Sequence, residues 1–434
     1  MNPPRSSRVW LGWEGRDSAP DQAPAELTLD SQVFPGGVPG DLVCQENRLF
    51  LGDNLGVMNA LLPKYEGRVD LIYVDPPFLT SRDFAARFAP GEDSRRPASW
   101  KTKRAFSDAW LDTPSYLTML ASRIAVLHRL LSQDGSLYLH LDWHASAYAR
   151  LLLDEVFGAE RLINEIAWVY HGPSPIRTAF NRKHDTILAY AKSDDYHFDA
   201  DSVRIAYNPS TWKTFASSPR AGFGRAPDLA RGKVPEDWWF FPVVARLHAE
   251  RTGYPTQKPE ALLERILLAS SRPGDLVLDA FCGSGTSPAV AARLGRRWLA
   301  CDSSPLSVAT TYRRLLLQDP TPPFSVWHAG APTPSGAIQS RWLGSRRGGR
   351  VYLDGLRPHG EPRQDPQTCL ACWEIDWQSD GQTFRSLSQV VRPWRQAKIP
   401  TEAASPEGVT VGPWIGLRAT DFDGRVYLGR VSGK

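Results

Sequence analysis

The sequence lacks the long apolar run that a membrane span requires, since no stretch approaches about 18 consecutive apolar residues. Its opening, MNPPRSSRVW, also lacks the apolar core of a secretory signal peptide. Cysteine is scarce, and the five cysteines are scattered: Cys44, Cys282, Cys301, Cys369 and Cys372. Such a set is typical of reduced thiols, so we expect a cytoplasmic protein without membrane contact.

Neither sign of charge dominates, and the sequence has no internal repeat. The formal net charge of +4 permits a polyanionic partner without demanding one. The 434 residues, of which 42% are hydrophobic, can bury a large core and predict two or three domains.

Strands alternate with helices over two parts of the chain, which predicts a doubly wound, mostly parallel α/β sheet. A polar, arginine-rich loop is expected from Leu79 to about Asp112. The expected divisions are a loose arm over 1–45, α/β halves over 46–195 and 252–319, an irregular insert over 196–251 and a small β-rich appendage over 320–434.

The stretch VDLIYVDPPFLT reads as a buried strand that ends at Asp75 and is followed at once by two prolines and Phe78. Proline cannot donate to a strand ladder, so Pro76 and Pro77 stop the strand and stiffen the chain beyond the carboxylate. A proline-rich turn without function is the alternative interpretation. A rigid carboxylate, carbonyl and ring at the mouth of a sheet predict a catalytic site formed by Asp75, Pro76, Pro77 and Phe78.

A second strand, VLD, ends at Asp279 and leads through a glycine-rich loop into a helix. Glycines there let backbone N–H groups approach a ligand at a helix N-terminus. Asp302 closes the next strand, where a carboxylate can accept hydrogen bonds from ribose hydroxyls. The pattern predicts a site for an adenosine-bearing cofactor, with an ordinary tight turn as the alternative. Pro288 stands near the place of the third glycine of the dinucleotide fingerprint, which disfavours NAD.

The two signals together predict an exocyclic amino group of a nucleobase as the substrate. The lone pair of such a nitrogen is delocalised into the ring, so the nitrogen is a poor nucleophile. Asp75 and the Pro76 carbonyl can each accept one N–H hydrogen bond and aim the lone pair at a methyl donor. Phe78 offers a ring on which the base can stack, and no metal is required.

DPPF together with DAFCGSGTS resembles the S-adenosylmethionine-dependent amino-methyltransferases of DNA. The catalytic motif precedes the cofactor loop, and this order is similar to that of the permuted β group, which includes the modification subunits of type III restriction systems. The resemblance spans about Asn47 to Leu317. It implies a circularly permuted, Rossmann-like methyltransferase domain, S-adenosylmethionine as cofactor and DNA as substrate.

The resemblance also implies which residues contact the cofactor. Asp53 in NRLFLGDNL corresponds to the acid that faces the adenine, and TQK in GYPTQKPEALLERIL lies near the methionine carboxylate. Tyr254 stands where the family usually has histidine. The implied cofactor-binding residues are Asp53, Thr256, Gln257, Lys258, Asp279, Phe281, Gly283, Ser284, Gly285, Thr286 and Asp302.

Two basic stretches are candidate contacts with double-stranded DNA. Residues 82–104 carry seven Arg or Lys against three acids, and residues 171–251 carry twelve against nine, interleaved with aromatic residues. By resemblance, the second stretch corresponds to the target-recognition region. A base inside a duplex cannot reach Asp75, so we expect it to flip out.

We expect N6 of adenine to be the acceptor, with N4 of cytosine as the nearest alternative. A nicotinamide-dependent oxidoreductase and a non-catalytic DNA-binding relative are the rival hypotheses. The chain shows no nuclease or helicase motif, so restriction would need a separate subunit, and a homodimer is a further hypothesis. His140 with His144, and Cys369 with Cys372, lack the additional ligands of a metal site, and we expect no metal.

Overall fold

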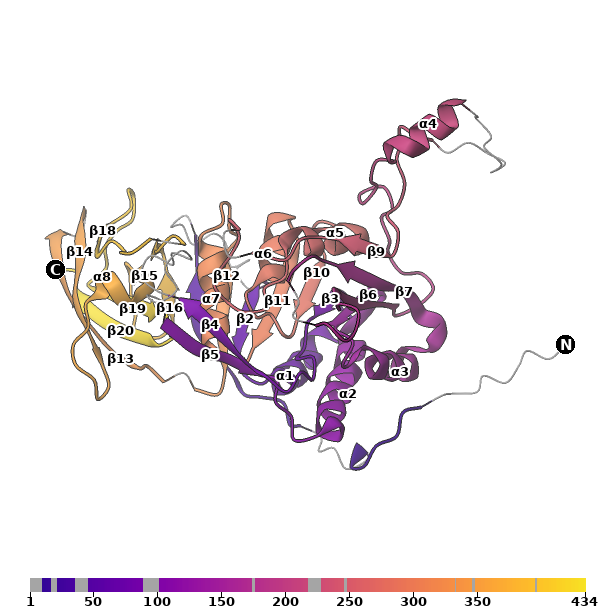
Figure 1. The fold of residues 1–434 in the computed structure, drawn as a ribbon. Helices are drawn as coiled ribbons and strands as arrows, with labels where there is room; N and C mark the ends of the chain where they lie inside the picture. Colours follow the sequence, from indigo (N-terminus) through magenta and orange to yellow (C-terminus); the bar gives the residue numbers. More distant parts are fainter. Residues whose placement is uncertain are drawn as a thin grey trace.

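The computed structural model describes residues 10–16, 22–35, 46–88, 101–173, 176–217, 228–245, 248–331, 333–345, 348–394 and 396–434. This part of the chain forms an eleven-stranded central sheet, a seven-stranded C-terminal sheet and a two-stranded ribbon (Figure 1). None of its helices combines the length and apolar character needed to cross a bilayer.

The central sheet has the strand order β16-β1-β12-β2-β11-β10-β3-β6-β8-β7-β9. Neighbours from β12 to β6 are parallel, so the carboxyl ends of these strands meet along one side, which we call the carboxyl edge. The strands are β1 (Leu27–Val33), β2 (Arg48–Leu51), β3 (Val69–Val74), β6 (Leu131–Leu141), β7 (Leu162–Val169), β8 (His184–Ala191), β9 (Trp238–Phe240), β10 (Leu276–Asp279), β11 (Arg297–Asp302), β12 (Phe324–Ala329) and β16 (Phe384–Ser386).

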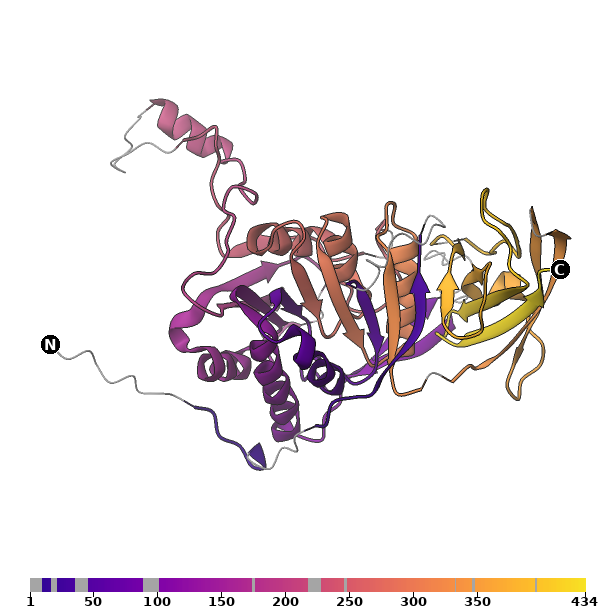
Figure 2. The same ribbon diagram turned by 180° about the vertical axis from the view of Figure 1, so that it is seen from behind.

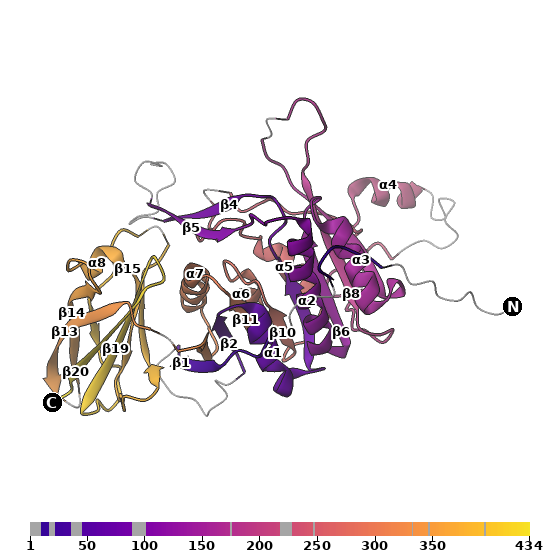
Figure 3. The same ribbon diagram turned by 90° about the horizontal axis from the view of Figure 1, so that it is seen from below.

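Helices cover both faces of the central sheet (Figure 3), and the side chains of β3 alternate between the two cores that result. Ile72 and Val74 pack in one core with α1 (Asn54–Tyr65), α2 (Thr113–Leu130) and α3 (Ser146–Phe157). Leu71 and Tyr73 pack in the other with α5 (Glu260–Ser270), α6 (Thr286–Arg293) and α7 (Pro305–Leu316). The predicted doubly wound, mostly parallel fold is therefore confirmed.

Three strands extend the sheet beyond β6 with mixed directions. β8 is antiparallel to both β6 and β7, whereas β9 is parallel to β7. The carboxyl edge consequently carries the start of β8 at His184, the end of β7 at Val169 and the end of β9 at Phe240. The short helices η4 (Ala159–Arg161) and α4 (Pro209–Ser217) lie in the connections, and α4 stands away from the sheet in Figure 1.

The C-terminal sheet has the order β17-β15-β19-β20-β13-β14-β18 and its own apolar core, which includes Trp373 and Trp377. Its strands, with one short helix, are β13 (Gly336–Ser345), β14 (Gly348–Pro358), α8 (Pro366–Cys369), β15 (Leu370–Asp376), β17 (Ser388–Val391), β18 (Glu402–Ala404), β19 (Trp414–Asp421) and β20 (Val426–Ser432).

Three segments differ from the sequence prediction. The supposed loose arm contributes β1, which pairs with β12 and β16 and lies beside the yellow C-terminal sheet in Figure 2. β12, expected in the appendage, lies inside the central sheet. The polar loop forms the ribbon of β4 (Asp83–Phe88) and β5 (Lys101–Ser107). Cys44, Arg95 and Arg96 lie outside the described residues, and the domain boundaries stay a prediction.

A buried ion cluster centred on Arg418 joins the two large sheets. Arg418 in β19 is only 5% exposed, and its guanidinium donates to the Asp30 carboxylate and, at 2.7 Å, to Ser31 Oγ of β1. Glu374 Oε2 of β15 lies 3.8 Å from Arg418 Nε, and the Tyr312 hydroxyl of α7 donates to Glu374. One arginine thus pairs with two carboxylates from different sheets, the fully buried Glu374 and the partly buried Asp30.

We predict that Arg418→Ala lowers the free energy of unfolding by about 3–5 kcal/mol, because the buried Glu374 and the partly buried Asp30 both lose their arginine counter-ion. Urea unfolding followed by tryptophan fluorescence measures this loss. The matched control is Arg430→Ala, which removes an exposed arginine that stacks on Trp414 of the same sheet and should cost less than about 0.5 kcal/mol. Equal losses in the two variants would contradict the assignment.

Candidate functional site

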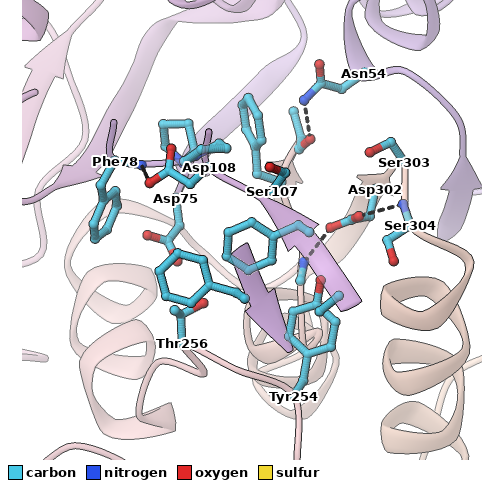
Figure 4. Close-up of a pocket in the computed structure, with 18 of the residues that line it drawn as sticks. Asn54, Asp75, Phe78, Ser107, Asp108, Tyr254, Thr256, Asp302, Ser303 and Ser304 are labelled. Atoms are coloured by element: carbon cyan, nitrogen blue, oxygen red, sulfur yellow. Dashed lines mark hydrogen bonds between the residues drawn. The ribbon is translucent and has the colours of Figure 1, made fainter. Parts of the chain in front are cut away.

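A cavity of about 560 Å³ opens at the carboxyl edge, next to the ends of β3, β10 and β11. This volume lies within the range of small-molecule sites. Figure 4 shows Asp75 and Phe78 toward one end of the cavity and Asp302, Ser303 and Ser304 toward the other. The predicted site residues that line it are Asp53, Asp75, Pro76, Pro77, Phe78, Thr256, Lys258, Phe281, Gly283 and Asp302.

Asp75 follows β3 directly, and its two carboxylate oxygens differ in their surroundings. Oδ2 accepts a hydrogen bond from Nζ of Lys258, which is itself buried and lies 5.1 Å from the centre of the Phe78 ring. Oδ1 is buried and has no hydrogen-bond partner in the described structure. A buried acceptor left unpaired is costly, so this oxygen is poised for a donor that the protein does not supply.

The turn after Asp75 is held by Asp108, which was not predicted from the sequence and is only 1% exposed. Its carboxylate accepts five hydrogen bonds, from the backbone N–H groups of Phe78 (3.1 Å), Leu79 (3.0 Å) and Thr80 (2.8 Å), the Thr80 hydroxyl (2.6 Å) and the Trp110 indole (3.0 Å). Leu79 has φ = 66°, a conformation that few non-glycine residues adopt. Asp108 therefore fixes the turn that presents Phe78.

Behind Phe78 lies a chain of buried polar contacts. The His140 ring stacks on Phe78 with 5.8 Å between centroids, and its Nδ1 is 2.8 Å from the Tyr73 hydroxyl. His140 Nε2 lies 3.2 Å from Asp185 Oδ2, and Asp185 Oδ1 accepts from Tyr170 at 3.0 Å. His140 therefore supports Phe78 by packing.

The glycine-rich loop between β10 and α6 turns toward Asp302. Gly283 has φ = 50° and donates its N–H to Asp302 Oδ2 at 2.9 Å, while Ser304 N donates to Oδ1 at 2.9 Å. Burial raises the pKa of Asp302 above its usual value. Gly285 has φ = 74°, and a Cβ there would lie 2.7 Å from Thr311, so only glycine fits against α7.

Asp53 lies at the start of α1, where its carboxylate accepts from the Leu55 N–H at 3.0 Å. Arg123 of α2 reaches into the same corner, with its guanidinium 2.9 Å from Asp53 and 2.6 Å from Asn54 Oδ1. Asn54 in turn donates to the Ala280 carbonyl at 2.7 Å. Asn54 and Arg123, neither of them predicted, thus tie Asp53 to the glycine-rich loop.

Several predicted cofactor residues do not line the large cavity. Gln257, Asp279, Ser284 and Thr286 line a smaller cavity of about 30 Å³, which shares Asp75, Thr256, Lys258 and Gly283 with the large one, while Gly285 lines neither. Asp279 accepts from Ser287 Oγ and from Phe281 N, and burial raises its pKa to about 7. Gln257 bonds to Thr252 and to the Glu250 carbonyl. Asp279 thus bonds to the glycine-rich loop and to α6, and Gln257 bonds to the segment that precedes it.

Tyr254, whose role the sequence left open, is buried and lines both cavities. Its ring stacks on Phe106 of the ribbon with 6.5 Å between centroids. A usable sequence signal existed for Arg123, a charged residue set within the apolar spacing of Leu120, Ile124 and Leu127. Asp108 gave no comparable signal, because most of its partners are groups of the turn that follows Asp75, about 30 residues earlier in the chain.

The chain is similar to a protein-family profile, to several sequence relatives and to several solved structures. A family profile described as DNA methylase, named for N6 and N4 methyltransferases, matches residues 69–312, more than half of the chain. The Type II methyltransferase M.BglII of Bacillus subtilis is 28% identical over 298 residues, which cover 66% of this chain and 74% of M.BglII. The DNA adenine methyltransferase YhdJ of Escherichia coli (strain K12) is 30% identical over 252 residues, which cover 57% of this chain and 76% of YhdJ.

Two solved structures are also similar. The complex of M1.HpyAVI with SAM has a TM-score of 0.40 and 19% identity, covering 62% of this chain and 98% of that one. The cytosine-N4-specific PvuII DNA methyltransferase has a TM-score of 0.42 and 19% identity, covering 64% and 88%. On the profile match and the sequence relatives, the chain belongs to the N6/N4 family of DNA methylases.

Proposed function

We propose that this chain transfers a methyl group from S-adenosylmethionine to N6 of adenine in double-stranded DNA, after the target base has flipped out of the helix. The observation that carries the proposal is the buried, unpartnered Oδ1 of Asp75, which lines the same cavity as Asp302 and the glycine-rich loop. An amino group of a base supplies the donor that this oxygen lacks.

The residues around the cavity fit an adenosine-bearing cofactor. Asp302 lines the cavity and keeps lone pairs beyond its bonds to the N–H groups of Gly283 and Ser304, so it can accept from ribose hydroxyls. Asp53 lies where the adenine would be held, and Thr256 and Lys258 lie beside Asp75, where the methionine end would be. When bound, S-adenosylmethionine supplies an activated methyl group on a sulfonium centre.

Asp75 and the two prolines act on the acceptor nitrogen. Oδ1 of Asp75 and the Pro76 carbonyl each accept one N–H hydrogen bond, which favours a pyramidal nitrogen whose lone pair points away from both acceptors. Lys258 binds the other oxygen, so Oδ1 stays aimed at the base. The Phe78 ring, supported by His140, stacks on the flipped base. The acceptors are rigid before the base arrives, which is electrostatic preorganisation.

The choice of adenine is supported by the tetrapeptide Asp-Pro-Pro-Phe and by the names of relatives such as YhdJ. N4 of cytosine stays the alternative, because the family contains both specificities and both amines pose the same geometric problem. A separate restriction subunit, a homodimer and membership of the permuted, type III-like subgroup are further proposals. The oxidoreductase hypothesis is set aside, because the chain belongs to a DNA methylase family.

Mass spectrometry of nucleosides from DNA treated with the protein and S-adenosylmethionine tests the proposal. We expect N6-methyladenine as the new nucleoside. N4-methylcytosine alone would refute the adenine assignment while leaving the mechanism intact. The absence of any methylated base from DNA of high sequence complexity would refute the function itself.

We predict that Asp75→Ala lowers the transfer rate at least about 10²–10³-fold, because the amino group loses its anionic acceptor. Calorimetric titration with S-adenosylmethionine should still show binding by this variant. Since the change leaves the Lys258 ammonium without its partner, the thermal midpoint is recorded alongside the rate. A folded Asp75→Ala variant with full activity would contradict the mechanism.

Asp108 is a positioning residue in this scheme, and its removal should slow transfer without weakening the cofactor. We predict that Asp108→Ala lowers kcat about 10²-fold, because the turn that presents Phe78 loses five hydrogen bonds and shifts. Asp108→Asn, which keeps one acceptor oxygen, should recover part of the loss. The matched control is Asp112→Ala, which removes the capping carboxylate of α2 that accepts from Ser115 at 2.8 Å and 2.6 Å. A similar fall in kcat for both alanine variants would point to general destabilisation.

A further inference from the structure

The loop between β7 and β8, residues 170–183, of which the structure describes 170–173 and 176–183, leaves the central sheet at the carboxyl edge. The register pairs Val169 with His184, and His140 of β6 with Ile187, so the loop begins and ends near the end of β6. β6 is the parallel neighbour of β3, which ends just before Asp75. In Figure 3 the magenta segment that precedes β8 projects from the side of the molecule that also carries the ribbon.

The two sides of β3 therefore have different neighbours. On one side, β10 and β11 carry the glycine-rich loop and Asp302, where we place the cofactor. On the other side, β6, β8, β7 and β9 present Trp143, the 170–183 loop and Phe240 at the same edge. DNA that delivers a base to Asp75 can therefore contact the protein on this second side.

The base of the loop is connected to the ring that we place beneath the flipped base. Tyr170 donates its N–H to the Lys183 carbonyl at 3.0 Å, which closes the base of the loop. The Tyr170 hydroxyl donates to Asp185, which contacts His140, and His140 stacks on Phe78. The loop therefore emerges immediately beside the proposed target pocket.

The composition of the loop suits insertion into a polyanion. Phe180 is 99% exposed, so its ring makes almost no contact with the protein. The loop also carries Arg177, Arg182 and Lys183 and contains no acidic residue. Arg182 stacks over Trp143, 4.1 Å from the ring centroid, and Trp143 is itself 49% exposed. In the ribbon, by contrast, Arg104 pairs with Asp83 and Lys103 pairs with Asp423.

We propose that the 170–183 loop enters the DNA duplex beside the target base and that Phe180 stacks in the space this base vacates. The inference rests on the proposed function, and the partner is double-stranded DNA at the step being methylated. Apolar side chains that insert between base steps compensate for lost stacking, and base–aromatic stacking tolerates any sequence. Arg177, Arg182 and Lys183 neutralise the phosphates on either side of the opened step.

The test compares two duplexes that differ only in the base opposite the target: a normal pair and a mismatch, in which flipping already costs less. Their sequence comes from methylated positions mapped in a host that expresses the chain. We expect Phe180→Ala to transfer methyl groups about 10- to 100-fold more slowly on the paired duplex, the loss corresponding to one base stack. On the mismatched duplex the loss should shrink to a few-fold, and Phe180→Trp should restore the rate on the paired one.

The matched control is Leu343→Ala, which removes a 56% exposed apolar side chain from β13 of the C-terminal sheet and should leave both rates unchanged. An equal loss by Phe180→Ala on both duplexes, or no loss on the paired one, would overturn the role of Phe180 and leave the methyltransferase assignment standing. Failure of the unaltered protein to methylate either duplex would overturn the proposed function and this inference together.

Discussion

The buried ion pair between Asp75 and Lys258 is the interaction on which the site depends. It joins two segments that are 183 residues apart in the chain, one after β3 and one before α5. The pair occupies Oδ2 of Asp75 and leaves Oδ1 buried and unpaired. A single contact thus neutralises the carboxylate and determines which of its oxygens is left for a donor. Breaking such a pair would leave an uncompensated buried charge, which is costly. This cost keeps the segment after β3 and the segment before α5 together.

Around this pair, the carboxyl edge divides its tasks by strand. β10 and β11 supply the glycine-rich loop and Asp302, β3 supplies the acceptors, and β6 to β9 supply aromatic and basic side chains. The order of the strands in the sheet therefore places the acceptors of β3 between the proposed cofactor side and the proposed DNA side. This order differs from the order of the strands in the sequence. The ribbon covers one side of the site. Asp108 follows β5 directly in the chain, and Phe106 of β5 packs on Tyr254.

The sequence was sufficient to predict the parallel sheet and to single out Asp75 and Asp302, because strands that end in acids and turn-forming residues leave a local pattern. It was not sufficient to predict β1, which lies in a segment rich in polar residues, or to place β12 in the central sheet, because the pairing partners of both strands are distant in the chain. Asp108 and Arg123 were missed for a related reason, since their roles depend on backbone groups and side chains that only the fold brings near. The assignment of Gln257 and Asp279 to the cofactor stays a prediction, and in the structure both side chains make hydrogen bonds within the protein.

β12 and β16 come from late in the chain, yet they lie at the other end of the central sheet from β9, on either side of β1. During synthesis, β1 must wait for about three quarters of the polypeptide before β12 is made, and longer still before β16 is made. A product that stopped after α7 would expose the bare side of β2 and leave β1 without both partners, and such open strand edges promote aggregation. A chain that ended after α7 would therefore carry every residue that lines the large cavity, yet on a central sheet that lacks β12 and β16.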